Sequence, residues 1–426
     1  MKIRFVTLGC KLNFAESSAL GKELLSRGHQ RASLNEVPDV CVVNTCSVTD
    51  AADHKDRQAI NQLHRKYPNA IIVVTGCYAQ LQPEQISQIE GVDYILGQNE
   101  KYSIPALVDT LEAQLLHNST QPLHNSTPPI RVCNIREVEE FHGVRSGDDR
   151  TRCFIKVQDG CNYFCTYCTI PYARGKSRNP KIEEVLSSAQ EAVDQGAKEL
   201  ILTGVNIGDF GRSTGESFVD LIKAIDELNG DFRVRISSCE PNLLTDEIID
   251  FVAQSKHFAP HFHIPLQSGS NEVLAIMKRR YTRELFAERV QHIKTVMPHA
   301  FIGVDCMVGV RGETQDYWED YLAFIKELDV SQLHVFTYSE RANTRMLEMD
   351  LYVVPKAERQ RRSKILHAVS EEKTRAFYAQ HAGRKAIVLW ESKREGDQMA
   401  GFTDNYIKVY APYQKDKVNT FEEIVL

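Results

Sequence analysis

The chain has no apolar run approaching the ~18 uncharged residues that a membrane-spanning helix needs, which argues against a membrane protein. It also has no excess of basic residues, because 51 Lys and Arg stand against 57 Asp and Glu, a net charge of −6 over 426 residues. That balance argues against a surface coated everywhere by nucleic acid but permits a local basic patch. Residues 1–6 carry charges within their apolar stretch and predict a strand rather than a secretory signal, so we expect a cytoplasmic protein.

The sequence also lacks a cysteine arrangement typical of a disulfide framework. Its eleven cysteines are an odd number, in a chain whose 42% hydrophobic residues suffice for sizeable cores. In a reducing compartment such cysteines are more often core residues, metal ligands or reactive thiols. The informative question is therefore which of them cluster.

The first part of the chain alternates short apolar runs with amphipathic helical patterns, which predicts βαβ units and a parallel sheet. The strands are expected at residues 3–8, 40–44, 71–75 and 92–96, with helices at 16–25 and 56–67. A polar stretch with a repeated Leu-His-Asn-Ser-Thr sequence follows and has little potential to pack. We therefore expect a domain at residues 1–115 and a linker at 116–135.

The same alternation returns with longer helices, so a second α/β domain is expected at residues 136–372. Its strands are expected at 154–157, 199–203, 233–237, 261–264, 301–307 and 332–337. Periodicity does not separate a doubly wound sheet from an open part-barrel. A helical pattern is expected at 356–380. The last domain is expected at 373–426, and the short antiparallel strands that follow the helix predict a small β-barrel there. These strands are expected at 385–391, 399–402, 406–410 and 422–426.

The sharpest motif is Cys161-Asn-Tyr-Phe-Cys165-Thr-Tyr-Cys168, directly after an expected strand. Three thiolates within eight residues can bind one face of a metal centre, because soft sulfur ligands suit iron–sulfur clusters or zinc. Structural zinc usually has four closed ligands, and no fourth lies nearby in sequence. Three ligands to a four-iron cluster would leave one iron open.

This C-x3-C-x-aromatic-C loop resembles that of the radical S-adenosylmethionine (SAM) enzymes, with Tyr167 as the aromatic residue. The resemblance implies a part-barrel of (β/α)6 type in which the open iron is chelated by SAM. Electron transfer would then cleave the sulfonium and yield a 5′-deoxyadenosyl radical. Protein environments tune cluster potentials from ~−700 to +450 mV, and the low end suits such a reduction.

Three further cysteines, Cys10, Cys46 and Cys77, each directly follow an expected strand. In a parallel sheet all three would emerge at the carboxyl edge, where ligands bind in open α/β folds. Gly9 and Gly76 would let the backbone approach a bulky ligand closely. The residues alone leave open whether these cysteines form a second cluster site or are small buried residues at strand ends.

Four segments together resemble the methylthiotransferase branch of radical SAM enzymes, over nearly the whole chain. They are Gly9-Cys10-Lys-Leu-Asn13, Asn44-Thr-Cys46-Ser-Val48, Thr75-Gly-Cys77 and Asp159-Gly-Cys161. The resemblance implies that Cys10, Cys46 and Cys77 hold an auxiliary 4Fe-4S cluster that delivers sulfur, whereas Cys161, Cys165 and Cys168 hold the SAM-cleaving cluster. No acid–base catalytic residue is expected, because the chemistry would take place at the two clusters.

Within that family, Gly9-Cys10-Lys-Leu-Asn13 and Ile170-Pro-Tyr-Ala-Arg174-Gly175 look most like the tRNA N6-threonylcarbamoyladenosine enzymes. The implied reaction replaces the C2 hydrogen of that adenosine, beside the anticodon, with a methylthio group. The implied partners are tRNA and an electron donor such as flavodoxin or ferredoxin. The enzyme itself is expected to be a monomer. Two other substrates stay open: isopentenyladenosine in tRNA and an aspartate of a ribosomal protein.

Several residues after the strands of the second domain are candidates for SAM binding, through backbone near glycine, hydroxyl groups or a carboxylate. They are Tyr167, Gly204, Asn206, Ser237, Glu240 and Gln267. Asp305 could also face inward or be a paired buried acid. The family commonly has Phe-Pro where this chain has Val310-Arg311, so the nearby loop is expected to differ.

The segment 355–395 has eleven Lys or Arg and five Asp or Glu, a net of +6, beside the expected β-barrel. Such a segment could track phosphates, although a solvated helix face explains it equally well. The tail resembles the family's RNA-binding TRAM domain at Gly401-Phe-Thr-Asp-Asn-Tyr406, but it is shorter than expected. The rival interpretation from another class is a non-catalytic RNA-binding protein with zinc on Cys161, Cys165 and Cys168.

Overall fold

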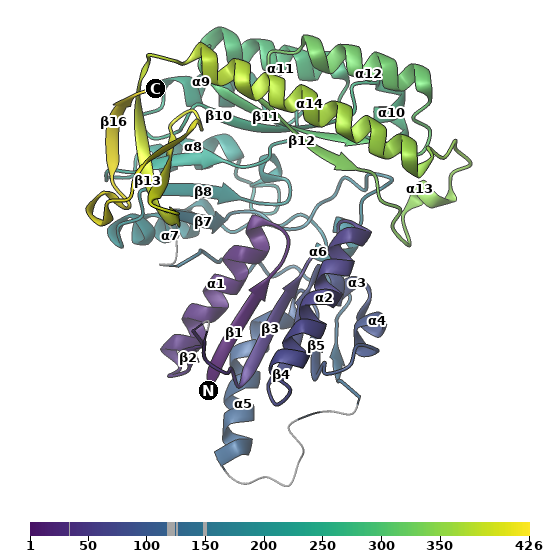
Figure 1. Cartoon of the computed structure of the whole chain (residues 1–426), viewed down its shortest axis with the longest axis vertical. Coiled ribbons are helices and arrows are strands. Elements are labelled where there is room, and N and C mark those ends of the chain that lie inside the picture. Colours follow the sequence, from purple (N-terminus) through teal and green to yellow (C-terminus); the bar gives the residue numbers. More distant parts are fainter. Residues whose placement is uncertain (34, 117–123, 125–126, 148–150) are drawn as a thin grey trace. The chain divides into compact units, whose positions relative to one another are not determined.

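The computed structural model describes residues 1–33, 35–116, 124, 127–147 and 151–426 (Figure 1). The chain forms two compact units. The first comprises Met1–Gly147 together with two short later segments, Asp159–Asn162 and Cys168–Lys176, and the second comprises the rest. The expected linker at 116–135 falls in large part on residues 117–123 and 125–126, which lie outside the described residues.

The first unit contains a six-stranded sheet in which every pair is parallel, as the alternating pattern predicts. In order of pairing, its strands are β2 (Gln30–Arg31), β1 (Lys2–Thr7), β3 (Val40–Thr45), β4 (Ile71–Gly76), β5 (Tyr94–Leu96) and β6 (Ile130–Arg131). The central strands β3 and β4 are buried along their whole length, which explains their continuous Val and Ile runs.

Helices cover both faces of this sheet (Figure 1). Apolar residues of α1 (Lys11–Ser26) and α5 (Ile104–Leu116) pack on one face, and those of α2 (Asp50–Lys66), α3 (Cys77–Leu81) and α4 (Pro83–Ser87) pack on the other. The short helix α6 (Ile170–Arg174) and the 3-10 turns η1 (Glu100–Ser103) and η2 (Ile135–Glu137) complete the unit.

Helix α2 illustrates how local sequence sets an element. The Thr49 side chain accepts a hydrogen bond from the Ala52 amide, and acidic residues occupy the first turn while basic residues occupy the last. This arrangement satisfies an otherwise unpaired amide and complements the helix dipole.

The second unit contains six parallel strands that follow one another in chain order. They are β7 (Arg152–Lys156), β8 (Glu199–Thr203) and β9 (Arg233–Ile236) in one sheet, and β10 (His261–Gln267), β11 (Phe301–Val308) and β12 (Gln332–Thr337) in another. Two isolated parallel bridges, Val234 with Phe258 and Ser238 with His263, connect the two sheets. A doubly wound sheet would reverse its strand order, whereas this order never reverses, so the part-barrel alternative is the one observed.

One large apolar core joins these strands to the helices that cover them. The helices in this core are α7 (Ile182–Asp194), α8 (Phe218–Asp226), α9 (Asp246–Gln254), α11 (Arg283–Val296), α12 (Gln315–Glu327) and α14 (Lys356–Gln380), with a 3-10 turn η3 (Ile207–Asp209). The helices α10 (Asn271–Ile276) and α13 (Arg345–Glu348) pack in a separate, smaller apolar cluster.

The tail forms a curled antiparallel sheet that fits a small barrel, as predicted (Figure 1). Its order is β15 (Lys408–Pro412), β14 (Gln398–Thr403), β13 (Lys385–Glu395) and β16 (Phe421–Val425). A 3-10 turn η4 (Lys415–Lys417) precedes β16. Buried Arg235 donates to the carbonyls of Thr403 and Asp404 at 2.6 Å, which anchors the tail to β9 within the same unit.

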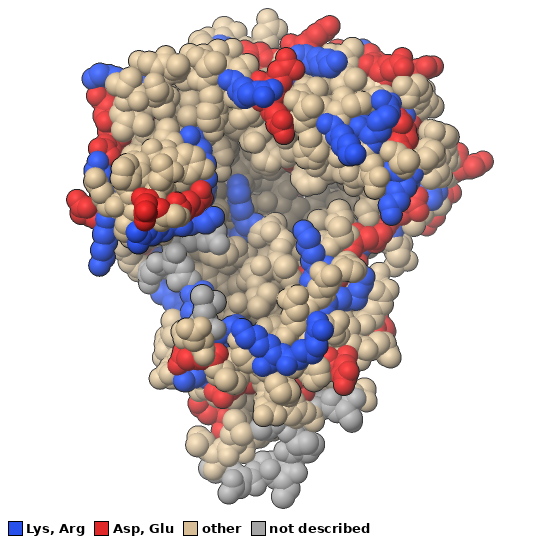
Figure 2. Space-filling view, in the orientation of Figure 1, with Lys and Arg blue, Asp and Glu red and all other residues tan. Residues whose placement is uncertain are grey.

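Charges of both signs are interspersed on the face drawn in Figure 2, in keeping with the small net charge of −6. Among the described residues, no helix is long and apolar enough to cross a membrane.

Candidate functional site

The structure places Cys10, Cys46 and Cys77 at one edge of the first unit's sheet. Cys10 caps the start of α1 after β1, Cys46 directly follows β3, and Cys77 opens α3 after β4. These three strands are neighbours, because β3 pairs with both β1 and β4 in parallel register. Cys46 and Cys77 are buried, whereas Cys10 is exposed. The three cysteines therefore lie at adjacent strand ends, and Cys10 is the exposed one.

Two glycines make this edge compact. Gly9 has φ +95°, and a Cβ on it would lie 2.6 Å from the Cβ and 2.8 Å from the Sγ of Cys46. Gly76 has φ +101°, and a Cβ there would lie 2.4 Å from the Thr45 carbonyl oxygen. These contacts show that both glycines allow neighbouring loops to approach one another, and the close approach to a ligand stays a prediction.

The environment of Cys46 and Cys77 disfavours their free ionised forms. Burial raises the pKa of Cys46 to about 12, and the charges of Cys77 and Cys10 act in the same direction. Burial also raises the pKa of Cys77, with Arg174 opposing this effect. A soft cationic metal centre would compensate the clustered thiolate charges on binding and displace their protons. The donor set of three sulfurs fits an iron–sulfur cluster.

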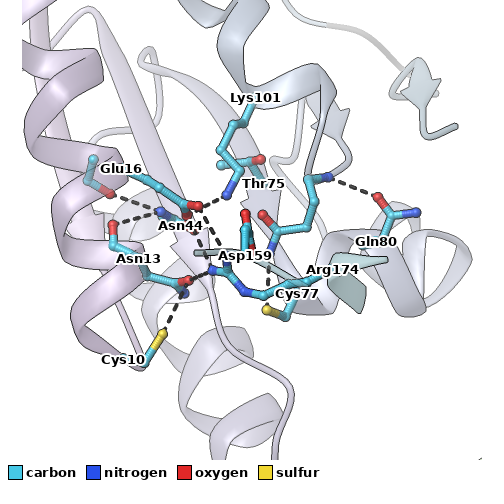
Figure 3. A network of polar contacts seen from close by, with 12 residues as sticks. Cys10, Asn13, Glu16, Asn44, Thr75, Cys77, Gln80, Lys101, Asp159 and Arg174 are labelled. Carbon is cyan, nitrogen blue, oxygen red and sulfur yellow. Dashed lines mark hydrogen bonds and ion pairs between the residues drawn. The ribbon is translucent and has the colours of Figure 1, made fainter. Parts of the chain in front are cut away.

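A buried polar network, centred on Arg174, lies beside these cysteines (Figure 3). The Arg174 guanidinium is 2% exposed and donates to Glu16 and Asp159 at 3.1 Å each and to Asn13 Oδ1 at 2.6 Å. Lys101 donates to the other Glu16 oxygen at 2.6 Å. Burial lowers the pKa of Arg174, but Glu16 and Asp159 outweigh it and hold that pKa well above its usual value. The guanidinium therefore stays charged.

Asn13 connects this network to the cysteine loops. Its amide group donates to the carbonyls of Leu8 at 2.9 Å and Thr45 at 2.8 Å, one from each of two neighbouring strand ends. Its Oδ1 faces both Arg174 and the Cys10 thiol, the latter at 3.8 Å. Asn13 and Arg174 both lie in motifs of the sequence, but their contact spans 161 positions, so no local pattern predicts a role for either.

The C-x3-C-x2-C loop divides between the units, with Cys161 and Cys168 in the first and Cys165 in the second. In the first unit the Cys161 amide donates to Gly175 O at 3.0 Å, and Cys168 Sγ accepts from the Ile170 amide at 3.4 Å. In the second unit Cys165 Sγ accepts from Arg279 Nη1 at 3.1 Å.

Arg279 is a residue that sequence reasoning missed. Its guanidinium contacts Cys165 and Tyr167 and forms an ion pair with Glu240. Burial raises the pKa of Glu240, while Arg279 opposes that shift. Glu240, expected as a ligand contact, is thus already engaged by a cation. The basic run Lys278-Arg279-Arg280 was the available sequence signal.

The remaining expected SAM contacts lie after strands of the second unit. Among the described residues, Ser237 Oγ and Gln267 Oε1 are buried without a hydrogen-bond partner, as a site built for a polar ligand would leave them. Gly204 makes room for Gln158, since a Cβ would lie 2.9 Å from its Oε1. That oxygen accepts from the amides of Val205 and Asn206 and fixes the turn.

Asp305 belongs to a polar group on three adjacent strands. Its Oδ1 lies 2.7 Å from His263 Nε2, and the rings of His263 and His334 stack at 4.8 Å. The ligand atoms of all three residues lie within 4.8 Å of one another, so they could hold a metal ion. Of the two alternatives for Asp305, the paired acid is observed. At the loop that departs from the family, Val310 is buried, and Arg311 pairs with Glu340 at 2.9 Å.

Comparison with known proteins gives two family matches. The model of the radical SAM superfamily matches residues 155–325, and that of the uncharacterized protein family UPF0004 matches residues 2–97. The six-strand part-barrel and the cysteine-bearing sheet each lie mainly within one of these matches.

Relatives extend over nearly the whole chain. It is 36% identical to the threonylcarbamoyladenosine tRNA methylthiotransferase MtaB of Bacillus subtilis (strain 168), over 99% of this chain and 93% of the relative. A protein of the same name from Aquifex aeolicus is 34% identical over 96% of both chains. A tRNA-2-methylthio-N(6)-dimethylallyladenosine synthase of Desulfitobacterium hafniense is 29% identical, over 100% of this chain and 94% of that protein.

Among solved structures, the fold is similar to the radical S-adenosylmethionine methyltransferase TsrM of Kitasatospora setae. The TM-score is 0.56 at 16% identity, covering 79% of this chain and 74% of that one. At this identity the likeness concerns the fold alone.

Proposed function

Because this chain belongs to the tRNA methylthiotransferase family of radical SAM enzymes, we propose that it methylthiolates C2 of N6-threonylcarbamoyladenosine beside the tRNA anticodon. The observation that carries this substrate is the full-length similarity, at 36% and 34% identity, to two relatives named for that nucleoside. Relatives named for dimethylallyladenosine are less similar, at 29% and 31%. Isopentenyladenosine is therefore the second candidate, ahead of a ribosomal-protein aspartate.

The family implies SAM and one 4Fe-4S cluster, for which Cys161, Cys165 and Cys168 are the proposed ligands. We assign a second cluster to Cys10, Cys46 and Cys77, supported by their positions on three adjacent strand ends. When bound, these groups would supply the electron, the radical that activates the C–H bond, and sulfur. Adenine C2–H lacks the acidity for ordinary proton abstraction, so a radical route is physically reasonable.

The chain's own residues would bind and orient these groups. Arg174 and Asn13 hold the loops of Cys10 and Cys46 in place, and Arg279 donates to the Cys165 sulfur. The orphaned polar atoms of Ser237 and Gln267 are the proposed contacts to SAM, together with Tyr167, Gly204, Asn206 and Glu240.

The proposed domain arrangement assigns the second cluster to residues 1–115, radical chemistry to 136–372 and RNA contacts to the tail at 373–426. The net charge of +6 over 355–395 supports the last assignment, since phosphate contacts need Lys and Arg. A small one-electron carrier, such as flavodoxin or ferredoxin, is the proposed reductant.

The test is anaerobic turnover of the reconstituted enzyme with two tRNA substrates, one carrying threonylcarbamoyladenosine and one carrying isopentenyladenosine. Mass spectrometry of the digested nucleosides should find the methylthio group on the first only. Modification of only the second would replace the proposed substrate with the alternative. Binding of zinc without iron or sulfide would support the rival zinc-protein interpretation, which conflicts with the family assignment.

A further inference from the structure

We infer that Gln98 is a positioning residue for the second cluster, holding an N–H···S hydrogen bond to the Cys77 sulfur that raises the cluster's reduction potential. The inference rests on the proposed function, because it takes Cys77 as a cluster ligand. Gln98 directly follows Gly97 at the end of β5, the strand that pairs with β4, and β4 leads into Cys77. Its side chain therefore reaches the edge that carries the cysteines from β5, the strand next to β4.

The contact itself is short and dry. Gln98 Nε2 lies 3.0 Å from Cys77 Sγ, and the two residues are 5% and 4% exposed. A sulfur acceptor is large, so 3.0 Å is a close approach for an amide donor. Water has little access to compete for either group, and a hydrogen bond in such surroundings is stronger electrostatically than one in water.

Two successive amide hydrogen bonds fix the position of Gln98. Its backbone amide donates to Gln80 Oε1 at 2.9 Å, and Gln80 Nε2 donates to the Cys133 carbonyl at 3.0 Å. Gly97 makes room for these hydrogen bonds, because a Cβ there would lie 2.5 Å from Gln80 Oε1. The Thr75 hydroxyl donates to the Gly97 carbonyl at 3.2 Å, which ties the segment back to β4.

The chemistry of Gln98 and Cys77 fixes which of them donates the hydrogen bond. An iron-bound thiolate has no proton and can only accept, so the amide must present its N–H to the sulfur. Hydrogen bonds to cluster sulfurs are among the factors that set reduction potentials. A donor stabilises the form with more negative charge, which is the reduced form. Removal of the donor should therefore make reduction harder.

Cys10 provides an internal contrast. Its neighbour Asn13 donates its amide hydrogens to the carbonyls of Leu8 and Thr45, and its Oδ1 faces the Cys10 sulfur. Asn13 thus offers no N–H to Cys10, whereas Gln98 offers one to Cys77. Of these two amide side chains near the site, Gln98 is the one placed to tune the cluster.

The test uses the full chain with the substitutions C161A, C165A and C168A, so that only the N-terminal cluster can assemble. Gln98→Leu and Gln98→Glu are added separately, and Gln88→Leu on the exposed surface after α4 serves as the matched control. After anaerobic reconstitution, iron and sulfide are counted, and the midpoint potential is measured by redox titration followed by electron paramagnetic resonance.

We expect equal iron content and a more negative midpoint potential in Gln98→Leu, with the control unchanged. Gln98→Glu, which keeps the length but can place a charge near the sulfur, should shift the potential further in the same direction. If Leu prevents assembly, the Glu variant supplies the measurement. Equal potentials at equal iron would overturn the role of Gln98 and leave the proposed function intact. A parent that holds no iron would instead overturn the second cluster itself.

Discussion

Arg174 and Glu16 form a buried ion pair at 3.1 Å although 158 positions separate them in the chain. Glu16 lies on α1, behind Cys10, and Arg174 lies on α6, just after the C-x3-C-x2-C loop. The pair thus joins the segment that carries one proposed cluster ligand to the segment that follows the other cysteine motif. It lies within the first unit.

Substitution of Arg174 by Ala should destabilise the first unit strongly. It would leave the carboxylates of Glu16 and Asp159 buried without their shared cation, and loss of one partner of a buried pair costs ~3–5 kcal/mol. Urea unfolding, monitored by hydrogen exchange of the backbone amides in α1 and β1, measures the change in the free energy of unfolding. Arg27→Ala is the control, because the side chains of Arg27 and its partners Glu23 and Asp109 are all exposed, and exposed ion pairs contribute little to stability. Equal effects of the two variants would contradict the role of the network.

Replacement of Cys10 by Ala should remove the iron of one cluster and leave that of the other. The matched variant is Cys41→Ala, because Cys41 lies in the middle of β3 and packs in the core on the face covered by α2. That variant should lose stability but keep its iron. Iron and sulfide are counted in both variants after anaerobic reconstitution. Unchanged iron in Cys10→Ala would show that Cys10 is not a ligand.

Gly9→Ala should reduce cluster loading as well as stability. The new methyl group would overlap Cys46, at 2.6 Å from its Cβ, and the residue would also have to keep φ +95°. Gly28→Ala separates the two effects, since Gly28 has φ +92° but nothing within 4 Å of an added Cβ. The control should cost only the left-handed backbone strain of ~1–2 kcal/mol and retain full iron. Loss of iron in both variants would mean that general instability, not the contact with Cys46, is responsible.

Glu199 should make the second unit sensitive to acid. Burial raises the pKa of this carboxyl, but Arg235, Arg233 and Arg152 outweigh burial and lower it to about 2. Unfolded glutamate titrates near ~4.3, so the stabilisation is complete above that pH and is lost as the pH falls toward 2. Glu199→Gln should be less stable by ~3–5 kcal/mol at neutral pH, because guanidinium groups lose their partner.

The difference between wild type and Glu199→Gln should narrow progressively below pH 4. Glu423→Gln is the control, since Glu423 pairs with Lys385 on the exposed surface and should leave the pH profile unchanged. Thermal unfolding between pH 7 and 2 measures both. A difference that stays constant across that range would refute the ionised state of Glu199.

Local sequence was a good guide to the regular elements. The predicted strands 199–203 and 332–337 and helix 356–380 agree with the structure to the residue. The first two helices begin earlier than predicted, at Lys11 instead of 16 and at Asp50 instead of 56. In the first, Leu12 and Phe14 stand two positions apart, a spacing typical of a strand, and in the second the first turn has no large apolar residue. For the second, the Thr49 cap and acidic first turn were signals in the sequence that periodicity ignored. Strand β6 was missed because only its pairing with β5 defines it.

The sequence by itself determined the α/β class, the strand ends that carry Cys10, Cys46 and Cys77, and the compact motif of Cys161, Cys165 and Cys168, because periodicity and spacing are local properties of the chain. The tertiary structure alone decided the part-barrel order, the partners of Arg174 and Arg279, and the approach of Gln98 to Cys77. Those contacts join residues up to 161 positions apart, and no periodic pattern records which distant polar side chains will share one buried space.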